Sequence, residues 1–198
     1  MHLYLIRHWQ TEENKYNIIA WQSDGTLSAS GKKQSLAIAR FFSDISIDAI
    51  YCSDLGRVQQ TAAPTLDQHS HAYSVFDSRL RERDQWILTG KSKSSIQEEF
   101  WENLDNIRES HPSVETKDAM NLRMKEIFDE IVSKHKNTND TVVVFSHHAF
   151  LHVAIKYFHQ EYFATRLVPG RIENASITHY HITWESAQII IENDTSHL

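Results

Sequence analysis

Short apolar runs alternate along this chain with longer stretches in which apolar residues recur every three or four positions. Four of the apolar runs are too short for buried helices and predict strands. One begins at Leu3, and the others cover residues 47–51, 73–76 and 141–145. The stretches between them have helical spacing. This alternation predicts an α/β protein whose mostly parallel sheet is covered by helices on both faces.

The helical stretches carry recognisable N-terminal signals. The caps that we expect are Ser28 or Ser30, Asp54, and a capping box made by Ser95 with Glu98 in a helix through Trp101 and Leu104. A further amphipathic helix is expected over residues 120–131, and another begins near Ala149. Residues 177–182 and 188–191 predict two closing strands, joined as a hairpin around Glu185 and Ser186.

Length and composition set the outer limits of the prediction. With 198 residues, 40% of them hydrophobic, the chain is long enough for one substantial core, so residues 1–198 are expected to form a single domain. The net charge is −6, and the 20 Lys and Arg residues form no basic block. We therefore expect a small charged metabolite as partner, and no nucleic acid.

The single cysteine, Cys52, lies in an apolar run and is expected to serve packing. No apolar span approaches the ~20 residues needed to cross a bilayer, and no leader pattern is seen, so we expect no membrane partner and a cytoplasmic location. The sequence leaves the oligomeric state open between a monomer and a homodimer.

Histidine and arginine side chains follow the predicted strands at the point where each strand ends. The first strand ends in Arg7 and His8, and the strand at 141–145 is followed by Ser146, His147 and His148. Open α/β folds bind ligands at the carboxyl ends of their strands. A guanidinium matches phosphate oxygens, and neutral imidazole can act as a nucleophile, a base or a metal ligand.

Two other segments add chemistry that suits a phosphate. Arg57 falls in the first turn of the helix after the second strand, where free backbone N–H groups already favour an anion. The segment after the third strand offers Glu82 and Asp84, and each is a candidate general acid.

Six motifs follow one another along nearly the whole chain. They are Arg7-His8 with Thr11 and Asn14; Asp24-x-x-Leu27-Ser28-x-x-Gly31-x-x-Gln34; Ser53-Asp54-Leu55-x-Arg57-x-x-Gln60-Thr61-Ala62; Leu80-Arg81-Glu82; Ser146-His147; and Asn174-Ala175-Ser176. In this order and spacing they resemble the motifs of the histidine phosphatase superfamily, in its phosphoglycerate mutase-like branch. The resemblance implies a phosphoglycerate mutase-like three-layer α/β/α sandwich with a mostly parallel central sheet.

The resemblance also implies an activity and a set of roles. It implies a phosphomonoester hydrolase that acts on a small phosphorylated metabolite through a phosphohistidine intermediate, with no metal and no cofactor. The implied roles are nucleophile for His8, phosphoryl binding for Arg7, Arg57 and His147, proton transfer for Glu82 with Asp84 as the fallback, and a further donor to the substrate from Asn14.

This chain departs from the family pattern at three positions near the implied site. Trp9 follows the nucleophile where the family usually has glycine, Trp21 stands three residues before Asp24 where glycine is also usual, and His148 replaces a third glycine. Either these side chains point away from the pocket, or they reshape it and contact the substrate. We count Trp9, Trp21 and His148 among the candidate substrate-binding residues.

Three alternatives to this hydrolase stay open. A phosphoglycerate mutase-type phosphotransferase would use the same chemistry, although the segment from Gly90 to Met120 is short for the insertion that closes over the substrate in such mutases. A catalytically impaired phosphate-binding protein is the second alternative. The third, a metal protein, rests on His148 and His152, whose spacing fits one helical face without the Glu or Cys that usually accompanies such ligands.

Overall fold

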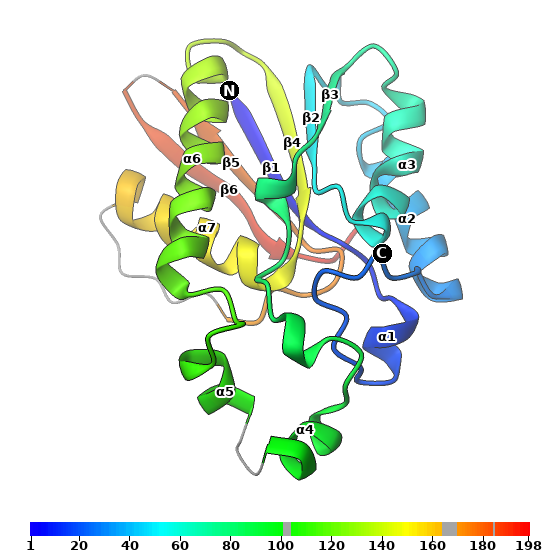
Figure 1. The fold of residues 1–198 in the computed structure, drawn as a ribbon. Helices are drawn as coiled ribbons and strands as arrows, with labels where there is room; N and C mark the ends of the chain where they lie inside the picture. Colours follow the sequence, from blue (N-terminus) through cyan, green and yellow to red (C-terminus); the bar gives the residue numbers. More distant parts are fainter. Residues whose placement is uncertain (101–103, 164–169, 184) are drawn as a thin grey trace.

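The protein was analysed as a computed structural model that describes residues 1–100, 104–163, 170–183 and 185–198. Its centre is one sheet with the strand order β3-β2-β4-β1-β5-β6 (Figure 1). The strands are β1 (His2–Arg7), β2 (Ala49–Cys52), β3 (Tyr73–Phe76), β4 (Thr141–Ser146), β5 (Ile177–Ile182) and β6 (Ala187–Asp194).

The register of β1 and β4 brings the predicted strand-end residues together. The two strands are parallel, with Arg7 opposite Ser146, so His8 and His147 follow at the same edge of the sheet. Strands β2 and β3 continue the parallel part, whereas β5 and β6 are antiparallel to their neighbours. The predicted mostly parallel sheet and the closing hairpin are thus confirmed.

Helices cover both faces of this sheet, as the alternating pattern predicts. The helices are α1 (Glu12–Lys15), α2 (Ala29–Phe41), α3 (Gly56–Gln68), α4 (Lys93–Phe100), α5 (Leu104–Ser110), α6 (Lys117–His135) and α7 (His148–Phe163), with short 3₁₀ helices η1 (Ser78–Leu80) and η2 (Trp86–Leu88). Helices α6 and α7 lie on one face and α2 and α3 on the other, while α4 and α5 lie outside these layers, beyond the carboxyl ends of the parallel strands (Figure 1).

Alternation along β1 divides the core between the two faces. Leu3 and Leu5 pack in one apolar cluster with residues of α6 and α7. Tyr4 and Ile6 point the other way and pack in a second cluster with residues of α2 and α3. A third, smaller cluster joins Ile19 to apolar residues of η2, α4 and α5. The segment beyond the strand ends therefore has an apolar centre of its own.

Two predicted caps are wrong, and in both cases a better partner takes the position. Asp54 does not cap α3, because its carboxylate binds the Arg81 guanidinium through two contacts of 2.7 Å. The Gly56 N–H at the start of α3 instead donates to Asp24 Oδ1 at 3.2 Å. The two parallel bonds to one guanidinium occupy both oxygens of the Asp54 carboxylate, and such bidentate pairs are among the stronger hydrogen-bonded contacts.

The helix predicted from Ser95 begins earlier than expected, at Lys93. Ser92 and Ser95 form the reciprocal pair, since each side-chain oxygen accepts from the other's backbone N–H at 3.0 and 3.1 Å. The predicted box with Glu98 is therefore wrong. Trp101, expected in the same helix, lies outside the described residues. Of the two candidate caps of α2, Ser28 is the one used, and its Oγ accepts from the Gly31 N–H at 3.0 Å.

Gly31 has a second reason to be glycine. A Cβ at this position would lie 2.4 Å from the Gln10 carbonyl oxygen, so only glycine lets the first turn of α2 approach the loop that follows His8. The motif glycine therefore helps to set the position of that loop.

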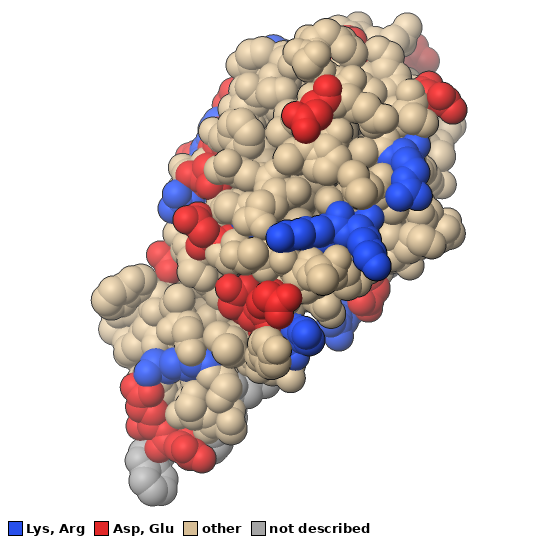
Figure 2. Space-filling model, turned by 90° about the vertical axis from the view of Figure 1, so that its right-hand side faces the viewer, with Lys and Arg blue, Asp and Glu red and all other residues tan. Residues whose placement is uncertain are grey.

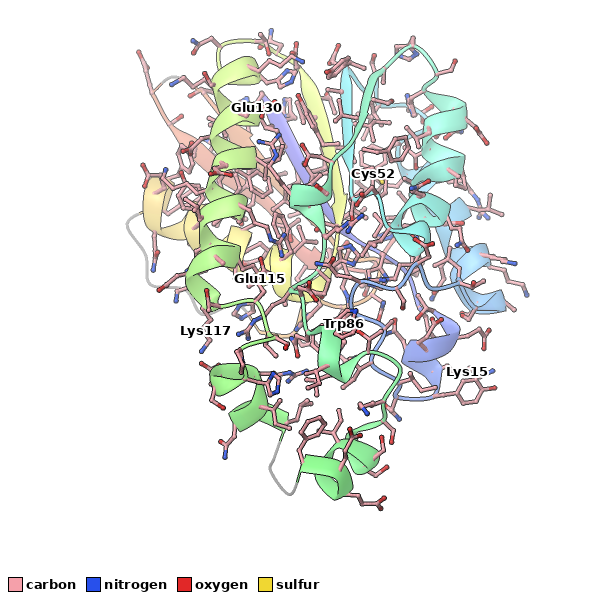
Figure 3. The ribbon with its side chains drawn as sticks, viewed as in Figure 1. Lys15, Cys52, Trp86, Glu115, Lys117 and Glu130 are labelled. Atoms are coloured by element: carbon pink, nitrogen blue, oxygen red, sulfur yellow. The ribbon has the colours of Figure 1, made fainter. Side chains whose placement is uncertain are left out.

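The surface over α2 and α3 carries basic and acidic side chains in small separate groups on a largely uncharged background (Figure 2). Within the described ranges, no helix combines the length and apolar character that crossing a membrane requires. Cys52 is buried at the end of β2, and burial raises the pKa of its thiol (Figure 3).

Candidate active site

A pocket of about 790 Å³ opens at the carboxyl ends of β1 and β4. It extends between α6 and α7 and is also bordered by residues from the α1–α2 loop, α5 and the segment after β3. The candidate site residues that line it are Arg7, His8, Asn14, Trp21, Arg57, Glu82 and His148. The structure thus brings together residues that are far apart in the sequence.

His8 lies at the base of this pocket, directly after β1, and is 4% exposed. Its Nδ1 lies 2.8 Å from the Trp9 carbonyl oxygen, which can only accept, so Nδ1 carries the ring proton. Burial lowers the pKa of His8 well below its ordinary value, and the charges of Arg57 and Arg7 lower it further. The imidazole is therefore neutral, with an unprotonated Nε2 next to the Arg57 guanidinium.

Arg57 enters the pocket from the first turn of α3, as predicted, and is held by backbone carbonyls. Its Nη1 donates to Ser23 O at 2.5 Å and its Nη2 to Trp21 O. The Nε donor lies 3.4 Å from His8 Nε2. Burial lowers the pKa of Arg57 to about 10, so the side chain remains a cation at neutral pH.

Arg7 is the second buried cation and has a donor left over. Its Nη1 donates to Ile172 O, whereas Nε is buried without a hydrogen-bond partner among the described residues. Burial lowers the pKa of Arg7 to about 10, against the opposing influence of Glu82. A buried guanidinium with an unsatisfied N–H is a favourable partner for an incoming oxyanion.

His147 does not line the pocket surface but lies directly behind it, fully buried. Its ring centroid is 5.1 Å from that of His8, and its Nδ1 accepts from Arg57 Nη2 at 3.0 Å. Its Nε2 then carries the proton and donates to Ser53 Oγ at 2.9 Å. Burial and the nearby Arg57 lower the pKa of His147 well below its ordinary value.

Glu82 lies across the pocket at the N-terminal end of α7. Its carboxylate accepts from three backbone N–H groups, those of Arg83 at 2.9 Å, Ala149 at 3.1 Å and Phe150 at 3.2 Å. The side chain is 8% exposed. These three bonds and the positive end of the helix dipole fix the carboxylate in one place.

Sequence reasoning missed the group that holds the Glu82 segment. Arg123 of α6 donates to the carbonyls of Arg79 at 2.8 Å, Arg81 at 2.7 Å and Glu82 at 3.2 Å. Glu115 pairs with the same guanidinium at 2.6 and 2.8 Å and lies at the start of α6 (Figure 3). Nothing in the sequence distinguishes Arg123 from other polar residues on an amphipathic helix, because only the fold brings it to this segment.

The second candidate acid, Asp84, lies elsewhere. It borders a separate surface hollow and not the pocket, and its N–H donates to Glu115 Oε2 at 2.9 Å. Of the two carboxyl groups, only Glu82 faces the site. No cluster of three or more His, Cys, Asp or Glu residues suited to a metal ion is found in the described part of the chain.

Comparison with known proteins decides the family. Residues 3–195 match the family model of the histidine phosphatase superfamily, branch 1. The chain belongs to this family. The resemblance on the six motifs is thereby confirmed.

Individual relatives carry different names. Over 99 residues the chain is 36% identical to a probable phosphoglycerate mutase, GpmB, of Escherichia coli, an alignment that covers 50% of this chain and 46% of that protein. The chain therefore spans about half the length of the mutase relatives that it matches. A probable phosphatase of Schizosaccharomyces pombe is 27% identical over 206 residues, which covers 100% of this chain and 95% of that protein.

Solved structures agree on the fold. YhfR of Bacillus stearothermophilus superimposes with a TM-score of 0.84 at 23% identity, covering 99% of this chain and 98% of that chain. A mycobacterial glucosyl-3-phosphoglycerate phosphatase gives a TM-score of 0.82 at 22% identity, covering 98% and 99%. At these identities the likeness shows the three-layer fold alone.

The two unusual tryptophans of this chain occupy different environments. Trp9 is fully buried and packs with Leu27 and Phe42 in the core cluster under α2 and α3. It does not line the pocket, so its expected contact with substrate is wrong. The reason is that the chain turns after β1, where the Trp9 N–H lies 3.3 Å from Thr61 Oγ1 and the indole enters the core.

Trp21 and His148 do line the pocket. Trp21 has a φ of +34°, a backbone conformation that favours glycine, and its ring lies 5.0 Å from the Arg108 guanidinium. His148 begins α7, and its Nδ1 lies 3.2 Å from Ile172 O, the carbonyl that Arg7 also binds. Burial, with Arg7 as the next cause, lowers the pKa of His148.

The different environments of the two indoles predict different costs of removal. Trp9→Gly should lower the free energy of unfolding by about 3–5 kcal/mol, because it leaves a large cavity in the core. Trp21→Gly should lower it far less, since glycine adopts the positive φ without strain. Urea unfolding followed by circular dichroism measures both, with the 76% exposed Trp86 replaced by alanine as the control. Equal losses at positions 9 and 21 would contradict the assignment.

Proposed function

We propose that this protein is a phosphomonoester hydrolase that acts on a small phosphorylated metabolite through a phosphohistidine intermediate. The observation that carries the proposal is the neutral His8, whose Nδ1 proton is engaged by the Trp9 carbonyl. Its Nε2 therefore carries a lone pair, which accepts from Arg57 Nε at 3.4 Å at the base of a pocket that two buried guanidinium groups also border.

The proposed reaction has two steps. In the first, His8 Nε2 attacks phosphorus as the bond to the ester oxygen breaks, and Glu82 gives its proton to the departing oxygen. In the second, Glu82 takes a proton from water, the water oxygen attacks the phosphohistidine, and the N–P bond breaks. The products are an alcohol and inorganic phosphate, and His8 and the protonated Glu82 are restored.

The charge of the transferring phosphoryl group is met by fixed cations. Arg7 and Arg57 are assigned to its oxygens, with His147 contributing from behind Arg57. Asn14 and His148 are proposed as substrate contacts because both border the pocket, although the Asn14 side chain also accepts from the Thr11 N–H at 3.3 Å. The scheme invokes no metal and no cofactor, since these side chains supply the neutralising charge.

We further propose that residues 1–198 act as one catalytic domain in the cytoplasm, as a monomer or a homodimer. The compartment is proposed on the buried, unpaired thiol of Cys52 in a chain with one cysteine, a usage typical of reducing compartments.

A phosphoglycerate mutase-type transfer is the second candidate, favoured by the 36% identity to a probable mutase over half of the chain. It would use the same phosphohistidine but return the phosphoryl group to an organic hydroxyl. Incubation with 3-phosphoglycerate distinguishes the two, because a mutase forms 2-phosphoglycerate from it and a hydrolase does not.

The phosphohistidine is directly testable. After brief incubation with p-nitrophenyl phosphate and rapid quenching in base, mass spectrometry should find phosphate on His8, stable in base and lost in acid. His8→Ala should lose essentially all turnover, because the substitution removes the attacking Nε2, which lies 3.4 Å from Arg57 Nε at the base of the pocket. Near-full activity in His8→Ala would overturn the mechanism. A folded wild-type protein without any turnover would instead favour a phosphate-binding role.

The proton-transfer role of Glu82 predicts a dependence on the leaving group. Glu82→Gln should reduce turnover of alkyl phosphates by about 100-fold, because their alkoxide must be protonated as it departs. The loss on p-nitrophenyl phosphate should be much smaller, since nitrophenolate leaves without a proton. Asp84→Asn is the matched control and should show no such split. Equal losses on both ester classes would remove Glu82 from this role.

A further inference from the structure

The pocket has a strong excess of positive charge. Among the described residues that line it, the basic ones are Arg7, Arg57, Arg83, Arg108, Lys117, Lys125 and Lys156, and the only carboxylate is Glu82. The whole chain, in contrast, has a net charge of −6. One transferring phosphoryl group faces Arg7 and Arg57. Of the lysines farther along the pocket, Lys117 pairs with Glu109 and Lys125 with Asp129, so Lys156 is the candidate partner for another part of the ligand.

The pocket continues along α7 away from the phosphoryl site. His148, His152, Lys156 and Gln160 all line it and are spaced four residues apart, which places them in a row along one face of the helix. At 1.5 Å per residue, Lys156 lies about 12 Å along the axis from His148. His148 itself shares the Ile172 carbonyl with Arg7 and so marks the phosphoryl end.

Each of the two helices contributes a lysine to the far part of the pocket, Lys125 from α6 and Lys156 from α7. Lys125 of α6 donates to Asp129 at 2.8 Å and to the Tyr157 hydroxyl of α7 at 3.3 Å, which places its ammonium beside the residue after Lys156. Lys156 lines the pocket, and no ion pair or hydrogen bond of its side chain is seen among the described residues. Since the Lys156 ammonium has no counterion among the described residues, it is a favourable place for an anion, whereas the Lys125 ammonium already pairs with Asp129.

The stretch between the two ends has a different character. Met120 and Met124 of α6 and Val153 of α7 line the pocket between these helices, together with the polar Asn121 and His152. A ligand that fits this profile is anionic at both ends and uncharged between them.

We propose that the substrate is a phosphomonoester whose opposite end carries a second anionic group, bound by Lys156 about 12 Å from the scissile phosphoryl group. This inference rests on the proposed hydrolase activity and deepens it by naming the substrate class. Compact metabolites such as phosphoglycerates do not belong to this class, because their three-carbon chain is too short to reach the second site.

A series of synthetic esters tests the proposal. Alkyl phosphates of increasing length are compared with phosphates of the same length that end in a carboxylate, and kcat/KM is measured for each pair. The carboxylate should raise kcat/KM by about fivefold or more once the chain spans the two sites, and the advantage should shrink at high salt. Shorter members should show no advantage.

Variants locate the effect. Lys156→Gln should reduce the ratio of kcat/KM for the carboxylate ester over the alkyl ester to about one, whereas Lys33→Gln, on the exposed side of α2, should leave the wild-type ratio in place. The inference would be overturned if the wild-type ratio of kcat/KM were near one at every chain length, or if the ratio stayed high in Lys156→Gln. The hydrolase proposal would still stand in either case, provided that p-nitrophenyl phosphate is turned over. Absence of turnover on every ester, p-nitrophenyl phosphate included, would overturn the hydrolase proposal and this inference with it.

Discussion

Two guanidinium groups buried beside a neutral imidazole are the constraint on which the rest of this structure depends. Arg57 is 2% exposed and Arg7 is 7% exposed, and burying a charge without partners is costly. Backbone carbonyls of Ser23, Trp21 and Ile172 and the nearby Glu82 carboxylate offset that cost. The same two charges disfavour a proton on His8, so the cations that would bind a phosphoryl group also keep the nucleophile neutral.

Meeting this constraint explains several otherwise unrelated features of the fold. The loop before Asp24 turns through a positive φ at Trp21, and this turn presents its carbonyl to Arg57. Ala175 also has a positive φ, of 60°, next to Asn174, whose side-chain amide donates to the His8 carbonyl at 3.0 Å. Two of the four non-glycine residues with positive φ in the described chain therefore lie where the backbone supports Arg57 and the nucleophile.

Local chemistry explains which parts of this arrangement the sequence could predict. Arg7 and His8 were placed correctly because a short buried strand must deliver its next residues to the carboxyl edge of the sheet. Residue type alone could not separate Glu82 from Asp84, and only the family resemblance favoured Glu82, since the choice depends on contacts with α7 that are remote in sequence. Trp9 was misplaced because the direction of its indole is set by the turn after β1, and residue type gives no information on that turn.

The supporting contacts are of the same long-range kind. Arg123 lies 41 to 44 residues along the chain from the three carbonyls that it binds. The cap of α3 comes from Asp24, again distant along the chain. Periodicity and strand-end position therefore predict the layers and the reacting groups, whereas the residues that hold those groups in place emerge only from tertiary structure.

The protonation state of His8 is the central claim, and nitrogen NMR measures it most directly. In ¹⁵N-labelled protein, with His8→Gln used for assignment, the spectrum should show the His8 ring protonated at Nδ1 and unprotonated at Nε2. That state should persist as the pH is lowered from about 7.5 to about 5.5, because the pKa of His8 lies well below the ordinary 6.5. A His8 ring that gains its second proton near pH 6.5, or that carries its single proton on Nε2, would contradict this account.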